Sequence, residues 1–153
     1  MLRIPVMTTL EGKSAFPENH PLSLGSGGRS IPKPVHVFLQ ESDLIFGIGC
    51  SFAITSFGTR MPQNKRVIHA TLDPMDLNKD LRSEIGLVGD AQLTLRGVIA
   101  ELKKLDLHKA VARKESTPAA IKAVRSAWMQ QWLPKLTSSA TPMTPYRVIY
   151  ELN

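Results

Sequence analysis

The chain has 153 residues, of which 42% are hydrophobic and 21% are charged, a composition typical of one soluble globular domain. It holds no run of roughly 18 apolar residues, as a membrane helix would need, and no signal-peptide pattern. A single cysteine excludes an internal disulfide framework and suits a reducing, cytoplasmic compartment. Five of the six net positive charges arise in residues 96–125, which hold eight Lys and Arg against three Asp and Glu. Without interleaved aromatic residues these charges predict a solvated helix face and no nucleic-acid partner.

The first two thirds of the chain alternate between apolar strands and helices. Strands are predicted at residues 4–9, 43–49, 66–73 and 85–90. A long loop rich in Pro and Gly follows the first strand and leads into a short helix at residues 34–42. Asp73 is a plausible N-cap for a short helix, and residues 91–105 form another helix. This alternation predicts an α/β fold, a Rossmann-like parallel sheet flanked by helices.

From residue 105 onward the sequence predicts helices only. Residues 116–134 have a Ser/Thr cap, Pro118 at the first helical position and a stop at Pro134. Trp128 and Trp132 share one face of this helix, which we interpret as packing against a neighbour. The expected organisation is an α/β domain at residues 1–104, a helical linker at residues 105–143 and the start of a further domain at residues 144–153.

Predicted secondary structure extends almost to both ends of the sequence. The first strand begins at residue 4, and the last helix has a start signal at Thr144 but no stop signal. We therefore expect a piece of a longer protein, in which the sheet lacks its first strand and helix.

Three predicted strands end in loops that could approach a ligand. Ligands of open parallel sheets bind at the carboxyl ends of the strands, where Gly49, Asp73 and Gly89 fall. Glycine permits close backbone approach, and the Ser51 hydroxyl can donate a hydrogen bond. Residues 23–28 predict a second flexible loop that is rich in hydrogen-bond donors. Asp90 has two open interpretations, a helix cap or an acceptor for ribose or adenine.

Catalytic and metal chemistry find no support in the sequence. Cys50 lies in no recognisable cysteine-protease pattern, and His69, inside an apolar strand, is interpreted as a core residue rather than a base. The histidines and carboxylates show no metal-ligand spacing. The dinucleotide fingerprint G-x-G-x-x-G fails because position 52 is Phe. We therefore predict no catalytic residue and no metal site in this chain.

Four blocks of sequence, in order, resemble the central domain of thiamine-diphosphate (ThDP) enzymes of the acetolactate synthase group. They are IPVMTTLEGKSAFPENHPLSLGSGG, ESDLIFGIG, KRVIHATLDPMDLNKD and VGDAQLTL, which together cover about residues 3–102. The last segment, TPMTPYRVIYELN, is similar to the one that opens the ThDP-binding C-terminal domain of that family.

The resemblance implies a six-stranded parallel sheet that does not itself bind ThDP. The cofactor and its Mg are then held by the flanking ThDP-binding domains, the partners of this domain within a homo-oligomer, while the middle domain binds FAD in some members and ADP in others. Carried over by position, the nucleotide-site residues are Gly25, Gly49, Cys50, Ser51, Asp73, Gly89 and Asp90.

Two departures from the family pattern weaken the nucleotide site. Flavin-binding members tend to have arginine at Ser51, and the acidic residue that would hold the ribose is Thr71 here. Losing such charge-assisted bonds predicts a weak or vestigial site. The predicted function is therefore the structural middle domain of a ThDP-dependent 2-oxo-acid decarboxylase or carboligase, a lyase or transferase, inactive alone. The alternative is a stand-alone module that binds a nucleotide such as ADP, FAD or CoA.

Overall fold

The computed structural model describes residues 2–108, 111 and 115–152. Strands and helices alternate in the first part of the chain, and helices alone follow, in agreement with the sequence pattern. In chain order the elements are β1 (Val6–Thr8), β2 (Ser23–Ser26), α1 (Lys33–Glu41), β3 (Leu44–Ile48), β4 (Arg66–Thr71), the 3-10 helix η1 (Pro74–Asp76), β5 (Ile85–Val88), α2 (Ala91–Leu102), α4 (Thr117–Leu136) and α5 (Pro145–Glu151).

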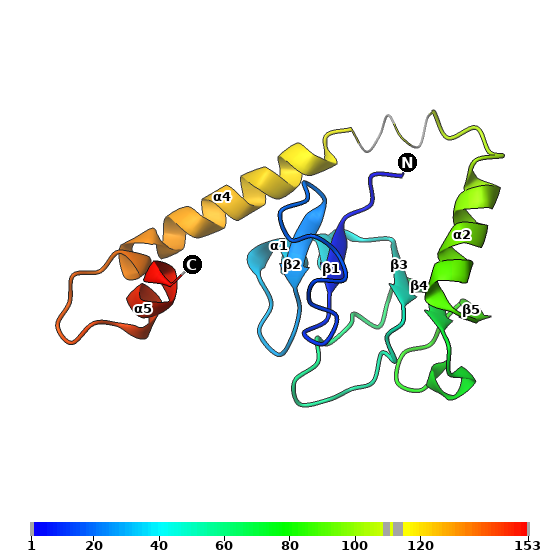
Figure 1. The fold of residues 1–153 in the computed structure, drawn as a ribbon, viewed down its shortest axis with the longest axis horizontal. Coiled ribbons are helices and arrows are strands. Elements are labelled where there is room, and N and C mark those ends of the chain that lie inside the picture. Colours follow the sequence, from blue (N-terminus) through cyan, green and yellow to red (C-terminus); the bar gives the residue numbers. More distant parts are fainter. Residues whose placement is uncertain (1, 109–110, 112–114, 153) are drawn as a thin grey trace.

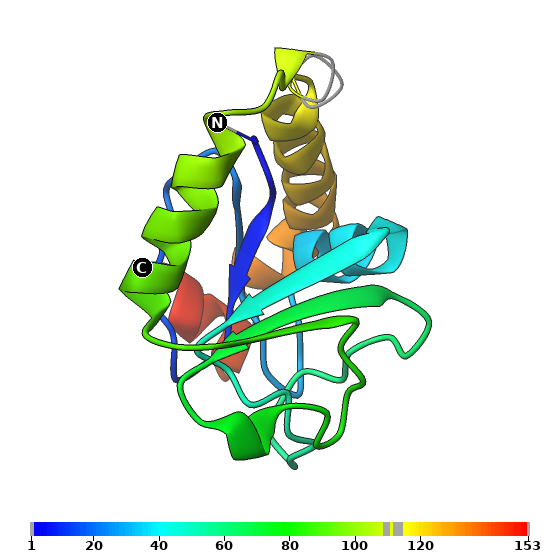
Figure 2. The same ribbon diagram turned by 90° about the vertical axis from the view of Figure 1, so that its right-hand side faces the viewer.

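All strand pairs in the described residues are parallel, which confirms the α/β class. They form two sheets, β1 with β2 and β3-β4-β5, rather than one continuous sheet. In Figures 1 and 2 the strands lie between α1 and α2, as expected for a parallel sheet flanked by helices. The prediction of parallel strands and flanking helices is confirmed. The strands form two separate sheets, however, where the sequence predicted one.

Strand β4 is the most deeply buried strand because it has a neighbour on both edges. Val67 is 1% exposed and His69 is wholly buried. The residues in register with His69 on the two neighbouring strands are both glycines, Gly47 and Gly86. Side chains in register point to the same face of a parallel sheet. On this face the space beside His69 is filled by Phe52, which lies where a Cβ on Gly47 would be, and by Leu77, which lies against the corresponding position of Gly86.

The main apolar core joins β2, α1 and α4. Leu24, Val35 and Ile121 are each at most 5% exposed and form one cluster. The guanidinium of Arg125 also donates a hydrogen bond to the carbonyl oxygen of Ser23, with an N–O distance of 2.6 Å. The beginning of α4 is therefore fixed to the α/β body, while its other end extends away from the strands toward α5 (Figure 1).

The far end of α4 differs from the sequence prediction. The helix continues through Pro134 and ends at Leu136, so the predicted stop at Pro134 was wrong. A proline in the last turn removes only one backbone donor, and Thr137 closes the helix by donating from its backbone N–H to the Leu133 oxygen at 2.9 Å. The expected packing is confirmed for Trp132, whose ring centroid lies 5.4 Å from that of Tyr146 on α5.

The segment SLGSGG was predicted as a flexible loop, but Ser23–Ser26 form β2. The Val6 N–H donates to the Leu22 oxygen at 2.9 Å, and the Gly27 N–H donates to the Thr8 oxygen at 2.7 Å. Gly25 adopts φ +98 beside an irregularity in the pairing, which suits glycine. The sequence pattern did not predict β2 because this strand has none of the β-branched residues that are enriched in strands.

In the residues that the structure describes, no helix is long and apolar enough to cross a membrane.

Replacing Ile121 with alanine tests whether α4 is part of the core. Ile121→Ala removes a side chain that is 1% exposed, so we expect the free energy of unfolding in urea to fall by about 2–5 kcal/mol. The matched control Ile99→Ala, on α2 and 43% exposed, should change it by at most about 0.5 kcal/mol. Equal small effects for both variants would contradict the packing of α4 on the body.

Candidate functional site

The loops that follow β3, β4 and β5 meet at one edge of the three-stranded sheet. The Gly49 N–H donates to the Ala70 oxygen and the Gly89 N–H donates to the Thr71 oxygen, both at 2.9 Å. These bonds extend the strand pairing by one residue and fix both glycines beside the end of β4. The carboxyl-end position predicted for these loops is thus what the structure shows.

Gly49 makes the turn at the end of β3. Its φ of +64 lies in the left-handed region that favours glycine, and no heavy atom lies within 4 Å of where a Cβ would be. The backbone is therefore open to close approach at this point, which is the property the sequence predicted for it.

Directly after this turn the loop folds back over the sheet. Phe52 has a φ of 51, which is uncommon for a bulky residue. Its ring meets the His69 ring edge-on, with centroids 4.8 Å apart, and lies where a Cβ on Gly47 would be. The face of the sheet near Gly47 is therefore covered by the protein's own side chain, a feature that the sequence analysis missed.

A hydrogen bond from His69 anchors the same loop. The His69 Nε2 atom lies 2.6 Å from the Cys50 carbonyl oxygen, and since a carbonyl only accepts, Nε2 carries the proton. The His69 Nδ1 atom has no hydrogen-bond partner in the described part of the chain. Complete burial agrees with the interpretation of His69 as a core residue, because a catalytic base must reach its substrate.

Cys50 is half-buried, and this burial raises the pKa of its thiol above the ordinary value. A raised pKa keeps the sulfur protonated near neutral pH, whereas nucleophilic cysteines need a lowered one. His69 contacts the Cys50 backbone and leaves its sulfur without that partner. The environment of Cys50 is that of a structural thiol.

The polar side chains at this edge mainly cap their own turns. Ser51 Oγ accepts from the Ala53 N–H at 3.2 Å, and Asp73 Oδ1 accepts from the Met75 N–H at 2.9 Å, which confirms Asp73 as an N-cap. Asp90 Oδ1 accepts from the Leu93 N–H at 2.9 Å, so the cap interpretation of Asp90 is correct. Among the residues that the structure describes, none donates a hydrogen bond to the second oxygen of either carboxylate.

The Gly-rich segment at residues 25–28 lies beside the loop that follows β3. The Thr59 hydroxyl donates to the Gly28 carbonyl oxygen at 3.1 Å, and a Cβ on Gly27 would overlap that hydroxyl. The two donor-rich segments predicted separately therefore lie together. No sequence pattern indicated that Thr59 links them, because the contact spans 31 residues.

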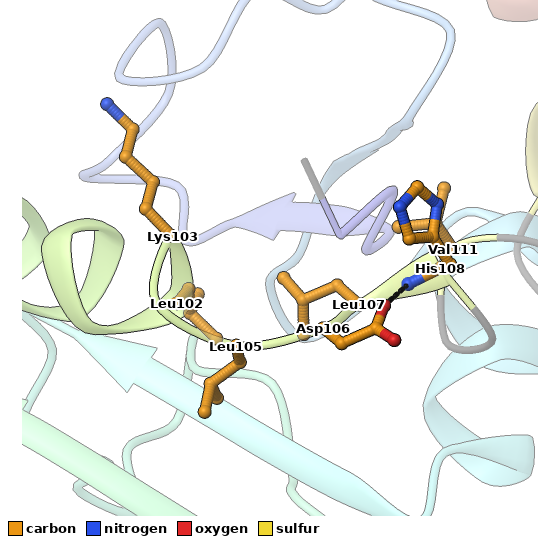
Figure 3. A pocket seen from close by; sticks show the side chains of 7 residues that line it. All are labelled: Leu102, Lys103, Leu105, Asp106, Leu107, His108 and Val111. Carbon is orange, nitrogen blue, oxygen red and sulfur yellow. Dashed lines mark hydrogen bonds between the residues drawn. The ribbon is translucent and has the colours of Figure 1, made fainter.

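Two hollows in the described part of the chain lie away from these loops. A cavity of about 690 Å³ opens beyond the carboxyl end of α2, on the connection toward α4 (Figure 3). A second, of about 360 Å³, lies between residues 19–21 and α4. Neither is lined by a predicted site residue. Among residues 2–108, 111 and 115–152, no three His, Cys, Asp or Glu side chains are grouped so as to hold a metal ion.

Two glycine variants test the position of Phe52. An alanine Cβ at Gly47 would overlap the Phe52 ring, so Gly47→Ala should lower the free energy of unfolding by about 1–3 kcal/mol. Gly97→Ala, at an exposed site on α2 with no heavy atom within 4 Å, should instead raise it by about 0.5–1 kcal/mol. In urea titrations, Phe52→Ala should relieve part of the Gly47→Ala loss; strict additivity of the two substitutions would contradict the overlap.

Alkylation of Cys50 tests its protonation. Because burial raises the thiol pKa, the midpoint of the pH profile for reaction with iodoacetamide should lie higher in the folded chain than in the chain unfolded in urea. Limited access of the reagent to a half-buried thiol lowers the reaction rate at every pH but does not move the midpoint. The midpoint therefore reports the protonation of the thiol alone. A lower midpoint in the folded chain would indicate an activated thiol and overturn the structural assignment of Cys50.

The chain matches a known protein family and several curated proteins. Residues 1–98 match the family profile described as "Thiamine pyrophosphate enzyme, central domain". A probable acetolactate synthase large subunit from Methanococcus aeolicus is 35% identical over 165 residues, covering 99% of this chain and 26% of that protein. One from Methanocaldococcus jannaschii is 38% identical over 108 residues, covering 69% of this chain and 18% of that protein.

A pyruvate oxidase from Lactiplantibacillus plantarum is 27% identical over 117 residues, covering 76% of this chain and 18% of that protein. The chain thus spans about a quarter or less of the length of the relatives it matches. The family match covers the strands, η1 and the loops that make up the candidate edge. The chain therefore belongs to the thiamine pyrophosphate enzyme central-domain family.

Proposed function

We propose that this chain is the structural middle domain of a ThDP-dependent 2-oxo-acid decarboxylase or carboligase of the acetolactate synthase type, and that it is inactive alone. The observation that carries this proposal is the match to the Methanococcus aeolicus protein, which covers 99% of the chain. Because that match extends well past residue 98, it supports a common arrangement of the α/β region and the helices that follow it.

In this proposal, ThDP and its Mg are held by flanking domains of the same enzyme, and the bound cofactor supplies the nucleophile and the electron sink. The described residues do not fit the metal, because Asp73 and Asp90 cap separate turns and no group of three potential ligands occurs among them. We therefore assign no catalytic residue to this chain.

The exposed apolar side chains support a role in joining other domains. Four large apolar side chains of the short helix α5 are each more than 40% exposed, namely Tyr146, Val148, Ile149 and Tyr150. A group of exposed apolar residues on one element is typical of a surface that another domain covers. We propose flanking ThDP-binding domains as the partners, in a cytoplasmic homo-oligomer. In the proposed organisation, residues 1–104 form the partial central domain, 105–143 the helical connection and 144–153 the start of the C-terminal domain.

The second candidate is a weak nucleotide site at the carboxyl edge. It is favoured by the open space at Gly49 and by the contact between residues 25–28 and the loop after β3. The site has Ser51 where an arginine would bind a diphosphate. The Ser51 hydroxyl and the carboxylates of Asp73 and Asp90 already accept hydrogen bonds from backbone N–H groups of their own turns. The residues proposed for this site are Gly25, Gly49, Cys50, Ser51, Asp73, Gly89 and Asp90.

Two assays on the 153-residue chain distinguish these functions. With pyruvate, ThDP and Mg, we expect no product above background, and ThDP-dependent turnover would overturn the structural role.

In calorimetric titrations with ADP, FAD and CoA, we expect dissociation constants above about 1 mM. A submillimolar value for any one ligand would favour the binding module. In that case Gly49→Val should abolish binding, because it fills the open position and strains the turn, whereas Gly97→Ala should not.

A further inference from the structure

The cavity of about 360 Å³ lies at the opposite end of the strands from the candidate nucleotide edge. Residues 19–21 directly precede β2 and lie beside the first turns of α4, so the cavity opens at the amino end of β2 (Figure 1). Its volume falls within the range of roughly 300 to 1,000 Å³ in which proteins bind small organic molecules. It is therefore large enough for a ligand that the carboxyl edge does not hold.

One wall of the cavity is a loop whose histidine is held in place. The His20 N–H donates to the Pro17 oxygen at 3.0 Å, and the Ser23 N–H donates to the His20 oxygen at 2.9 Å. The His20 Nδ1 atom accepts from the Leu22 N–H at 3.1 Å, and the ring meets the Phe16 ring edge-on with centroids 5.0 Å apart. Because a backbone N–H only donates, Nδ1 is the acceptor and Nε2 carries the proton. This wall therefore supplies a fixed N–H donor.

The other wall is one face of α4. Lys122, Arg125 and Ser126 are three and four positions apart, a spacing that places them on the same side of a helix. Arg125 is half-buried, and its hydrogen bond to the Ser23 oxygen at 2.6 Å holds the guanidinium beside the loop. The Lys122 ammonium group donates to no acceptor in the residues that the structure describes. This wall carries two positive charges and a hydroxyl group.

In the described part of the chain, no acidic side chain forms a salt bridge with Lys122 or Arg125. No Asp or Glu is among the described residues that line the cavity. Glu18, just before the loop, instead accepts through Oε1 from Lys13 at 2.7 Å and from Ser26 at 2.9 Å. The hydrogen bond from Lys13 is the main cause of the lowered pKa of Glu18, and the charge of Arg125 is a lesser one. The cavity is therefore cationic, and its charges lack a direct counter-ion among the residues described.

Apolar residues complete the lining, namely Pro21, Pro118 and Ala119. Converging polar donors beside an apolar surface are typical of a site for a small organic molecule. An arginine and a lysine together favour a phosphate group, which offers three acceptor oxygens and nearly two negative charges at neutral pH.

We propose that this cavity, here named the His20–α4 cavity, binds a small organic phosphate. The phosphate group contacts Lys122, Arg125 and the His20 Nε2–H group, and the organic body packs against the two prolines. Such a site differs from the candidate nucleotide site in its residues and in the end of the sheet at which it lies. The proposal is independent of the function proposed above.

A titration with phenyl phosphate, followed through the amide NMR signals of the 153-residue chain, tests the His20–α4 cavity. Phenyl phosphate combines the charged group with a flat apolar body. We expect saturable shifts at residues 20, 22 and 119–126 and no shift at Gly49 and Gly89. Benzoate, which has a single charge and two oxygens, should bind at least about threefold more weakly.

Substitution of Lys122 tests the charge of the cavity. Lys122→Gln removes one exposed positive charge, so the dissociation constant for phenyl phosphate should rise at least about threefold. Lys122→Arg should restore binding because it returns the charge. The matched control Lys103→Gln, the same change at the end of α2, should leave the dissociation constant unchanged. Urea unfolding of the three variants shows whether each keeps the fold.

Other outcomes would overturn the proposal. Equal affinity of the Lys122→Gln and Lys103→Gln variants would show that the cavity does not bind the phosphate. Benzoate bound as tightly as phenyl phosphate would contradict the choice of phosphate. Shifts confined to Gly49 and Gly89 would place the ligand at the carboxyl edge and favour the nucleotide site instead. Equal shifts with uncharged benzyl alcohol would show that the cavity binds the apolar body alone.

Discussion

A parallel strand is stable when both of its edges are paired and both of its faces are covered, and in this protein β4 meets that condition most fully. Its neighbours on both sides leave Val67 and His69 almost completely excluded from water. The ends of β3 and β5 are held to it through Gly49 and Gly89. The candidate edge is therefore organised around β4, and the strands farther from it are less completely covered.

The loop after β3 combines an open turn with side chains that already make local contacts. The turn at Gly49 retains open space, but the following residues fold back so that Phe52 covers the sheet and Cys50 is bonded through its backbone to buried His69. The side chain at Ser51 then serves its own turn. Residues 49–59 of this loop carry no charged side chain, which suits the proposed structural role better than tight nucleotide binding.

Much of this arrangement follows from local sequence patterns. The apolar runs predicted β3, β4 and β5, and the carboxylates of Asp73 and Asp90 predicted where helices begin, because capping depends on neighbouring residues only. The strand at residues 23–26 escaped prediction since its residues have low strand propensity and are held by pairing with β1. The contacts of Phe52 and Thr59 join residues far apart in sequence, so no local pattern could indicate them.

The central claim is that these residues are one structural part of a larger ThDP enzyme, and the intact mass of the natural protein tests it most directly. An antibody raised against this chain would capture the protein from its source cells for mass spectrometry. The account predicts a polypeptide about four times longer than this one, as in the Methanococcus aeolicus relative. A natural product of 16.9 kDa, the mass of the 153 residues alone, would contradict it.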